Sequence, residues 1–263
     1  MENVYITKVI LEEVRNLTYA EIPLSTKEKK NLIITGKNGS GKTTVLNAVA
    51  SYLNAVFESN GIEYEKKYLK MDEENLDYRK THGGTESEIR EIERRVYDRK
   101  DRLTLLKHGI EIELNCSGEH AHQLFQDGRV VLAYYKADRV FRTDIRRHVE
   151  KVQLQDQYSI DENPRDNLVK YLLDLKMTQA LSATNGKYEK ATDIQRWFDN
   201  FEKLLQKIFE NKQLKLEFDE ETFKFSIKEP EKEAYDFNSL SSGYAAILDI
   251  VVDLMIRMEK QTN

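Results

Sequence analysis

A glycine-rich segment between an apolar run and an amphipathic stretch constrains the fold of this chain more than any other feature. The run before it, residues 31–35, predicts a buried strand, and the apolar spacing after it predicts a helix to about residue 58. The segment fits the pattern G-x-x-x-x-G-K-[ST] and consists of Gly36, Lys37, Asn38, Gly39, Ser40, Gly41, Lys42 and Thr43. A strand, a glycine loop and a helix in this order predict an α/β fold with a phosphate-binding loop (P-loop).

Each part of this loop suits a phosphate group. Glycines let backbone N–H groups curve around an anion, and the N-terminus of the following helix adds partial positive charge. We expect Lys42 to reach the β- and γ-phosphates and the Thr43 hydroxyl, next to Thr44, to bind Mg²⁺. The alternative is a glycine-rich turn that binds nothing, but the correct pattern on both flanks favours the phosphate site.

Composition narrows the remaining possibilities. The 263 residues suffice for one large domain or two small ones, and 33% of them are charged. No apolar stretch is long enough to span a membrane and no signal peptide is recognisable, so we expect a cytoplasmic protein without a membrane partner. The single cysteine, Cys116, excludes an internal disulfide. Because the net charge is −5, any DNA contact would come from a local basic patch. The candidate patch is residues 136–151, with Lys136, Arg139, Arg142, Arg146, Arg147 and Lys151.

The chain divides into three predicted parts. Residues 1–60 contain two strands within 3–24, then the P-loop and its helix. Residues 61–108 contain many charges of both signs, and we interpret them as a charged, partly helical, mobile insertion with one ordered helix. Residues 109–263 begin with strands over 109–116 and 129–135. Helices over about 164–182 and 189–210 follow, the second with an aromatic stripe that we assign to the core. A hairpin over 214–227 and an apolar helix from about 240 to 259 complete this part.

A second motif lies about 200 residues after the P-loop, at the start of the last helix. Leu240-Ser241-Ser242-Gly243 resembles the L-S-G-G-Q signature of ABC-type ATPases, in the L-S-S-G form of RecF-like, SMC-like and OLD-like relatives. The N-terminal strand pair with Arg15 and Asn16 is similar to that group as well. The resemblance covers residues 1–58 and about 236–260. It implies a P-loop NTPase of the ABC-ATPase head type, with a mixed sheet, an N-terminal antiparallel β subdomain and a helical subdomain. The alternative is that Ser241 is an ordinary helix N-cap.

The resemblance also implies a mechanism. In that family two heads dimerise head to tail, and each ATP is clamped between the P-loop of one head and the signature of the other. Ser241 would then donate to the γ-phosphate, and Gly243 would permit close backbone approach. Lys42 and Ser241 are thus the implied catalytic residues, while Arg15, Asn16 and Ser242 are implied in nucleotide binding. ATP and Mg²⁺ are the implied ligands, a second copy or a partner subunit is the implied partner, and DNA repair or anti-phage defence is the implied role.

One departure from the family concerns hydrolysis. The Walker B strand, which ends in Asp-Glu and should follow the signature, is not found, because the segments around Asp249 and Asp253 have helical spacing. We therefore expect the chain to be part of a longer ATPase, or a split subunit, that binds ATP and hydrolyses it poorly. The Gln that contacts the metal in the family stays open among Gln123, Gln126, Gln153, Gln155 and Gln157. Arg139 is a further candidate phosphate contact.

Two other functions fit the sequence less fully. The first is a nucleotide-gated interaction or scaffold module, in which ATP acts as a switch and is hydrolysed little. The second is a transporter nucleotide-binding subunit. The charged insertion disfavours the transporter, as does the lack of a convincing adenine-stacking aromatic residue before the P-loop, where Tyr19 is a poor candidate.

Overall fold

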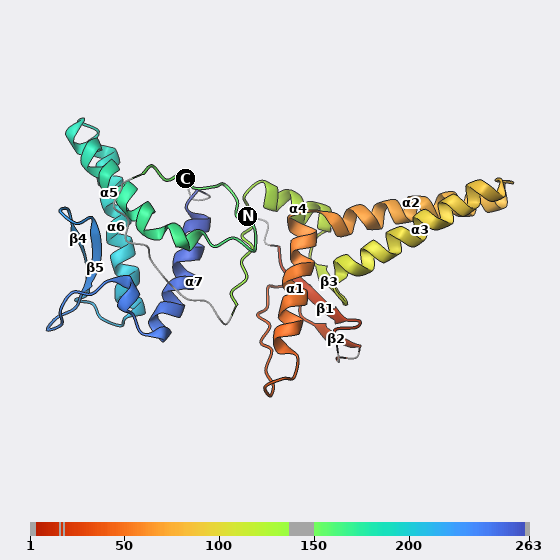
Figure 1. Ribbon diagram of the computed structural model, residues 1–263, viewed down its shortest axis with the longest axis horizontal. Helices are drawn as coiled ribbons and strands as arrows, with labels where there is room; N and C mark the ends of the chain where they lie inside the picture. The colour runs from red at the N-terminus through yellow and green to blue at the C-terminus, as the bar shows by residue number, and fades with distance from the viewer. Residues whose placement is uncertain (1–3, 16, 18, 137–149, 261–263) are drawn as a thin grey trace. The chain divides into compact units, whose positions relative to one another are not determined.

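The computed structural model describes residues 4–136, apart from positions 16 and 18, and residues 150–260 (Figure 1). The chain forms two compact units, residues 1–132 and 133–263. The P-loop belongs to the first unit and the Leu240–Gly243 segment to the second. Across the described parts of both units, no helix is long and apolar enough to cross a membrane.

The first unit is built on a three-stranded antiparallel sheet with the order β2-β1-β3. β1 (Ile6–Leu11) lies between β2 (Ala20–Pro23) and β3 (Ile110–Leu114). Val9 is buried and pairs with Ile22 on one side and with Ile112 on the other. Burial alternates along β1, as expected for a strand with one face on the core. The strands predicted within residues 3–24 and 109–116 are confirmed.

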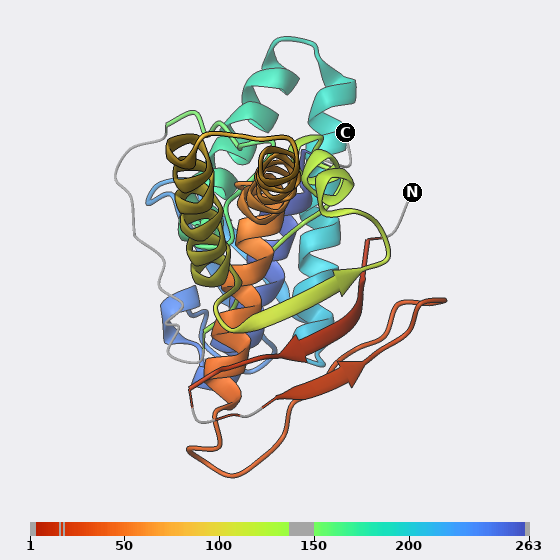
Figure 2. The same cartoon turned by 90° about the vertical axis from the view of Figure 1, so that its right-hand side faces the viewer.

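Helix α1 (Lys42–Phe57) packs its apolar stripe on this sheet (Figures 1 and 2). Tyr52 is fully buried, its hydroxyl donates to Glu111 Oε1 at 3.2 Å, and burial raises its pKa to about 12. A short helix, α4 (Gly118–Gln126), packs on α1 through an edge-to-face contact between Phe57 and Phe125. The helix predicted after the glycine loop is therefore confirmed, and its burial against the sheet fixes the position of the loop.

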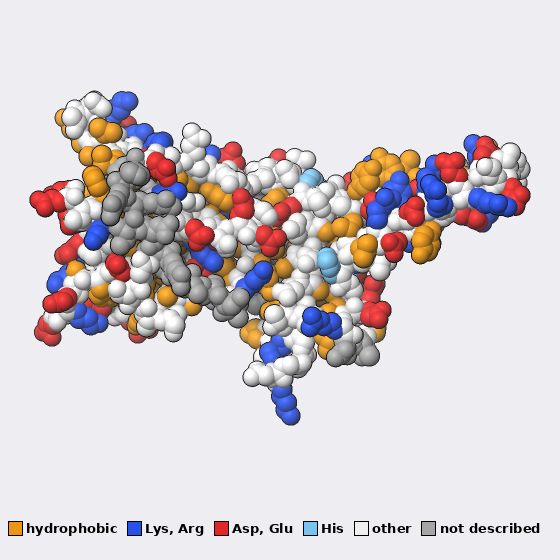
Figure 3. Space-filling model, in the orientation of Figure 1, with side chains coloured by type: hydrophobic (Ala, Val, Ile, Leu, Met, Phe, Trp, Pro, Cys, Tyr) orange, Lys and Arg blue, Asp and Glu red, His pale blue; other side chains and the backbone are white. Residues whose placement is uncertain are grey.

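Residues 61–108 form a helical hairpin rather than the single ordered helix that we expected. α2 (Gly61–Thr81) and α3 (Glu86–Lys107) pack against each other, and a capping box between Thr85 and Glu88 begins α3. The expectation was wrong because α2 carries a seven-residue apolar repeat, Ile62, Leu69 and Leu76, that its many charges obscure. The charges of both signs along the hairpin are visible in Figure 3.

Ion pairs across the hairpin explain why so charged a segment is helical. Arg99 on α3 donates to Asp72 at 2.6 Å and to Glu65 at 3.1 Å, both on α2. Glu65 is buried, and the Arg99 guanidinium also lies 4.9 Å from the centre of the Tyr68 ring. Acidic side chains of one helix thus meet basic side chains of the other, and charge favours the pairing of the two helices.

Two of the strands predicted for the P-loop fold, residues 31–35 and 129–135, are not strands in the structure. Residues 31–35 have no regular structure, and Ile33 is 82% exposed instead of buried. Residues 129–135 likewise have no regular structure and are only partly buried. An apolar run becomes a strand only where a second strand supplies hydrogen-bond partners, and no described strand pairs with either run. The sheets of the described residues are therefore antiparallel, whereas we expected a mixed sheet.

The second unit is mainly helical. η1 (Pro164–Asn167) leads into α5 (Leu168–Thr184), which packs against α6 (Tyr188–Ile208). β4 (Lys215–Asp219) and β5 (Lys224–Lys228) form the predicted antiparallel hairpin. A short turn, η2 (Phe237–Ser239), precedes α7 (Ser242–Met258). The predicted helices and hairpin are confirmed, and the apolar stripe of α6 is core, as expected: Ile194, Phe198, Phe201 and Leu205 are buried.

Helix α7 carries a buried ionic network along one side. Asp253 accepts from Arg257 Nε at 2.7 Å and from the Tyr135 hydroxyl at 2.7 Å, and both charged residues are almost fully buried. One turn earlier, Asp249 pairs with Arg165 of η1 at 2.7 Å. These acids lie inside a helix, in agreement with the sequence-based exclusion of both positions as a Walker B strand.

Candidate nucleotide-binding site

The P-loop surrounds the start of α1, and Lys42 is the first residue of that helix. The Lys42 ammonium donates to the carbonyl oxygens of Gly36 at 2.8 Å and Lys37 at 2.7 Å. These two hydrogen bonds hold the charged Lys42 side chain over the loop. Residues 36–40 are exposed, which leaves the outer side of the loop accessible to a ligand.

Glycine is required at two positions of this loop. Gly39 and Gly41 have φ angles of +80° and +87°, in the left-handed region that disfavours side chains. A Cβ at Gly41 would also stand 3.2 Å from Leu17 Cδ1. Gly41 precedes α1 and brings no side chain of its own, so the first N–H groups of the helix face the loop, as an anion site requires.

The turn that carries Arg15 lies next to the P-loop. The Leu17 N–H donates to the Val14 carbonyl at 3.0 Å, Arg15 has a φ of +52°, and Leu17 is the residue that packs against Gly41. Arg15 is exposed, and its neighbour Asn16 lies outside the described residues. The structure therefore brings the Arg15 turn and the P-loop together, and the predicted nucleotide contacts of both residues stay predictions.

The signature-like segment begins α7. Ser241 occupies the N-cap position of α7 and has extended backbone angles, but its side chain makes no capping hydrogen bond. Ser242 is the first helical residue, and a Cβ at Gly243 would meet no atom of the described residues within 4 Å. By contrast, Asp236 caps the preceding η2 through the N–H groups of Asn238 and Ser239. The Ser241 hydroxyl and the open side of Gly243 are thus not occupied by packing within the segment.

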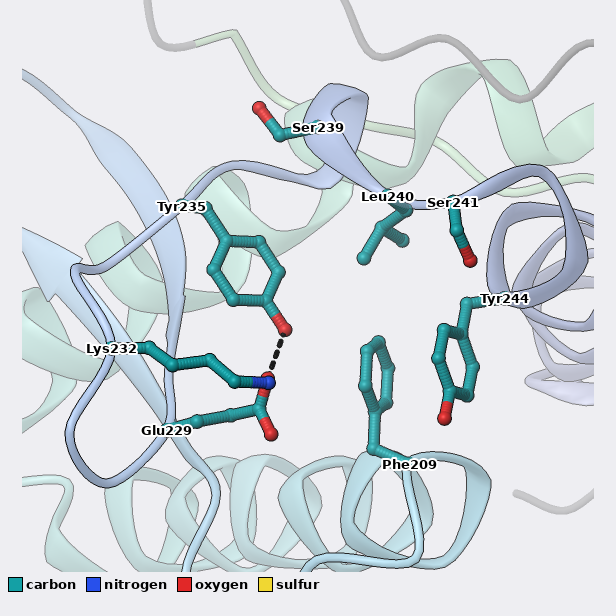
Figure 4. A pocket seen from close by; sticks show the side chains of 8 residues that line it. All are labelled: Phe209, Glu229, Lys232, Tyr235, Ser239, Leu240, Ser241 and Tyr244. Carbon is teal, nitrogen blue, oxygen red and sulfur yellow. Dashed lines mark hydrogen bonds and ion pairs between the residues drawn. The ribbon is translucent and has the colours of Figure 1, made fainter.

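A hollow of about 240 Å³ lies beside Ser241 (Figure 4). Its lining residues come from the C-terminal end of α6, the segment between β5 and η2, the end of η2 and the start of α7: they are Phe209, Glu229, Lys232, Tyr235, Ser239, Leu240, Ser241 and Tyr244. Sequence reasoning identified only Leu240 and Ser241 of this set. Tyr244, one residue after the motif, could have been included, whereas nothing in the sequence connects Glu229 or Lys232 with it.

Glu229 is the charged centre of this hollow. Its Oε1 accepts from Lys232 Nζ at 2.9 Å and from the Tyr235 hydroxyl at 2.7 Å, and its Oε2 accepts from Asn211 at 2.9 Å. The hydrogen bond from Lys232, followed by those from Tyr235 and Asn211, lowers the pKa of Glu229 to about 2. Burial and the bond to this carboxylate raise the pKa of Tyr235. At neutral pH Glu229 is therefore an ionised carboxylate and Tyr235 a neutral phenol.

Thr43 is the predicted metal ligand. It is the second residue of α1 and is exposed. Mg²⁺ beside a nucleotide is bound by one or two protein oxygens, phosphate oxygens and water, and a single threonine hydroxyl next to the phosphate loop fits that arrangement. Within the described ranges, no group of three or more His, Cys, Asp or Glu side chains could hold a metal ion by itself.

The described contacts do not assign the remaining candidates to the nucleotide site. Gln123 and Gln126 lie on α4, where Gln123 donates to Asp127 at 2.8 Å. Gln155 donates to Glu162 at 3.3 Å in the second unit. Arg139 and most of the basic patch fall within residues 137–149, outside the described residues. The choice of the metal-contacting glutamine thus stays open.

The exposed glycine loop, the lysine held over it and the helix that starts behind it define a P-loop nucleotide-binding domain. A family model described as an AAA domain matches residues 8–239, and the chain belongs to this family. Membership implies the α/β fold of P-loop NTPases, nucleotide binding, typically with Mg²⁺, and a function of the ATPase type. Neither a curated protein nor a solved structure matches the chain.

Proposed function

We propose that this chain is the ATP-binding head of an ABC-type ATPase, and that two heads dimerise around ATP. The observation that carries the proposal is the state of Ser241. This residue precedes α7 without a capping hydrogen bond, and two residues later the Cβ position of Gly243 is more than 4 Å from any described atom. A hydroxyl at a helix N-terminus suits a phosphate oxygen of a nucleotide bound elsewhere. The P-loop of a second copy would supply that nucleotide, held by Lys42 and, through Mg²⁺, by Thr43.

The proposed role in the cell is DNA repair or anti-phage defence in a bacterium. It is supported by the resemblance of the L-S-S-G motif and the P-loop to RecF-like and OLD-like proteins. DNA would contact the basic patch of residues 136–151, since the net charge of −5 offers no general attraction. We expect the affinity of the parent protein for DNA to fall steeply as the salt concentration rises. The affinity of an Arg146→Ala, Arg147→Ala double variant should fall less steeply.

A second candidate is a nucleotide-gated interaction module that hydrolyses little ATP. It is supported by the acids that follow the signature. Asp249 and Asp253 pair with Arg165 and Arg257, and a carboxylate bound to an arginine is less available to Mg²⁺ or to a water molecule. Phosphoryl transfer depends on those two tasks. Measurement of phosphate release by the dimer separates the candidates, because the module predicts ATP-dependent dimers without turnover.

The test of ATP binding is titration calorimetry on three proteins. We expect Lys42→Ala to lower ATP affinity about 100-fold, because charge-assisted hydrogen bonds worth about 3 kcal/mol are lost. Lys29→Ala, which removes the same charge from an exposed position outside the loop, should bind as the parent does. Equal affinity in all three proteins would overturn the assignment of the P-loop.

The test of the dimer is light scattering with and without ATP. Ser241→Arg should leave ATP binding intact and abolish ATP-dependent dimers, because the bulky cation fills the space in front of α7. Ala183→Arg adds the same side chain at an exposed position near the end of α5 and should dimerise normally. Dimers that form equally well in the Ser241 variant would rule out the signature as the contact.

A further inference from the structure

The hollow beside Ser241 is not explained by a contact between Ser241 and a phosphate. A γ-phosphate would need only the hydroxyl and the start of α7, yet the hollow continues away from them to Tyr235 and Glu229 (Figure 4). Its volume of about 240 Å³ lies below the range of about 300–1,000 Å³ typical of sites for a whole small molecule. It is thus of a size to receive one part of a larger ligand.

Aromatic rings border the hollow on two sides. Tyr244 stacks on Phe209 with a centroid distance of 4.6 Å and an interplanar angle of 11°. The Tyr235 ring stands across the hollow from this pair (Figure 4). Tyr244 is 39% exposed although it is aromatic and belongs to the first turn of a largely apolar helix. A planar ring placed here would gain stacking contacts, as bases do on aromatic side chains.

The polar groups of the hollow offer a hydrogen-bond donor next to an acceptor. An ionised carboxylate accepts up to about four hydrogen bonds, and Glu229 accepts three from the residues described above, so it can accept another. Lys232 has three N–H donors, and its side chain is 62% exposed. A neighbouring donor and acceptor on a flat aromatic ring are the edge pattern of a nucleobase.

We propose that this hollow binds the nucleobase of a nucleotide whose phosphates lie at Ser241. The inference rests on the proposed function, in which the P-loop of a second copy holds that nucleotide. The base would stack against Tyr244 and Phe209 and form hydrogen bonds with Glu229 and Lys232. A free nucleotide presents the same chemistry and is the other possible source, so the experiment includes an arm that separates the two.

The experiment is photolabelling with ATP that carries an azide on its adenine ring, followed by tryptic digestion. Cleavage after Lys232 and Arg257 gives one peptide, residues 233–257, that contains Tyr235, Ser241 and Tyr244. We expect label in this peptide. Tyr244→Ala should reduce the label and weaken ATP-dependent dimerisation about tenfold, because stacking of a base is lost. Tyr244→Phe should restore both, and Tyr188→Ala, at a 70% exposed tyrosine on α6, should change neither.

Each outcome decides the inference. If the label in this peptide disappears in Lys42→Ala, the hollow binds the base of a nucleotide that is held by a P-loop. If the label persists in Lys42→Ala, the hollow still binds a nucleobase, and the nucleotide comes from free solution. ATP-dependent dimers with label only outside residues 233–257 overturn the nucleobase site and leave the proposed function standing. A parent protein that does not bind ATP at all overturns both. Because the mapping on the parent needs no variant, misfolding of Tyr244→Ala would not obscure the result.

Discussion

Substitution of Arg257 by Met is expected to destabilise the second unit strongly. The guanidinium is 4% exposed and donates from Nε to Asp253 at 2.7 Å. Its two terminal nitrogens donate to the carbonyl oxygens of Ser159 at 3.0 Å and Glu162 at 2.6 Å, with a longer contact to Tyr158. One side chain therefore ties α7 to the loop before η1, and methionine fills similar space without any of these hydrogen bonds.

The magnitude follows from the burial of both charges. Removal of one partner of a buried ion pair costs about 3–5 kcal/mol, because the other charge stays buried without compensation. Since several charge-assisted bonds to carbonyls are lost as well, we expect the free energy of unfolding to fall by at least about 4 kcal/mol. Total stabilities are about 5–15 kcal/mol. With a slope near 2 kcal/mol/M, the urea midpoint should fall by about 2 M.

The assay is urea unfolding followed by tryptophan fluorescence. The chain has a single tryptophan, Trp197. It is partly buried, packs edge-on against Tyr171 and Phe198 at the core of the second unit, and therefore reports on that unit. As a control, Arg196→Met breaks an exposed pair with Asp193 and should cost less than about 1 kcal/mol.

A double variant tests the cause of the loss. Addition of Asp253→Asn to Arg257→Met neutralises the buried carboxylate and keeps an acceptor for Tyr135. We expect it to recover about 2 kcal/mol, since the remaining loss comes only from the carbonyl contacts. A double variant no more stable than Arg257→Met, or a single substitution that costs under about 1 kcal/mol, would refute the account of α7 as held by a buried ion pair.

Two further predictions concern other parts of the chain. Gly109→Ala should cost at least about 3 kcal/mol in circular-dichroism unfolding, because its φ is +77° and the new Cβ would stand 1.9 Å from the Glu13 carbonyl oxygen. Gly83→Ala, with a φ of +84° and nothing within 4 Å, should cost only about 1 kcal/mol; equal costs would contradict the steric argument. The pKa of Glu229 is lowered from 4.5 to about 2, so the stability that it contributes is complete above pH 4.5 and disappears as the pH falls toward 2. Glu229→Gln should flatten this part of the acid-unfolding curve, and an unchanged curve would count against the folded-state pKa.

Local patterns predicted those elements whose partners are close in sequence or whose apolar face is continuous. β4 and β5 form a hairpin joined by a short turn, and the stripe of α6 from Ile194 to Leu205 defines a helix by itself. The run at residues 31–35 has an equally clear apolar pattern, but strand formation depends on partners elsewhere in the chain, which local pattern does not supply. In α2, the apolar repeat from Ile62 to Leu76 is sparse, and its stability depends on α3.

The candidate site was predictable to the extent that its residues follow each other along the chain. The P-loop and the Ser241 segment are continuous motifs, so they could be located without a structure. The hollow is different, because Phe209, Glu229 and Tyr244 come from separate elements and meet only after α6, the hairpin and α7 have packed. The ionisation of Glu229 depends on the same packing, since Asn211 and Tyr235 reach it from other segments.

The length of the α2–α3 hairpin can change without a change in the nucleotide-binding loop. Both ends of the hairpin are fixed at the base, where α2 follows α1 and α3 leads directly into β3, while Gly83 at the tip has no atom near its Cβ position. α2 alone, with 21 residues, extends about 30 Å. Matched insertions of seven residues in each helix would keep the apolar repeat in register and lengthen the arm by about 10 Å each time. The length of such an arm can therefore change while the glycine loop, which precedes the N-terminus of α1, stays the same, because α2 begins only after the C-terminus of α1.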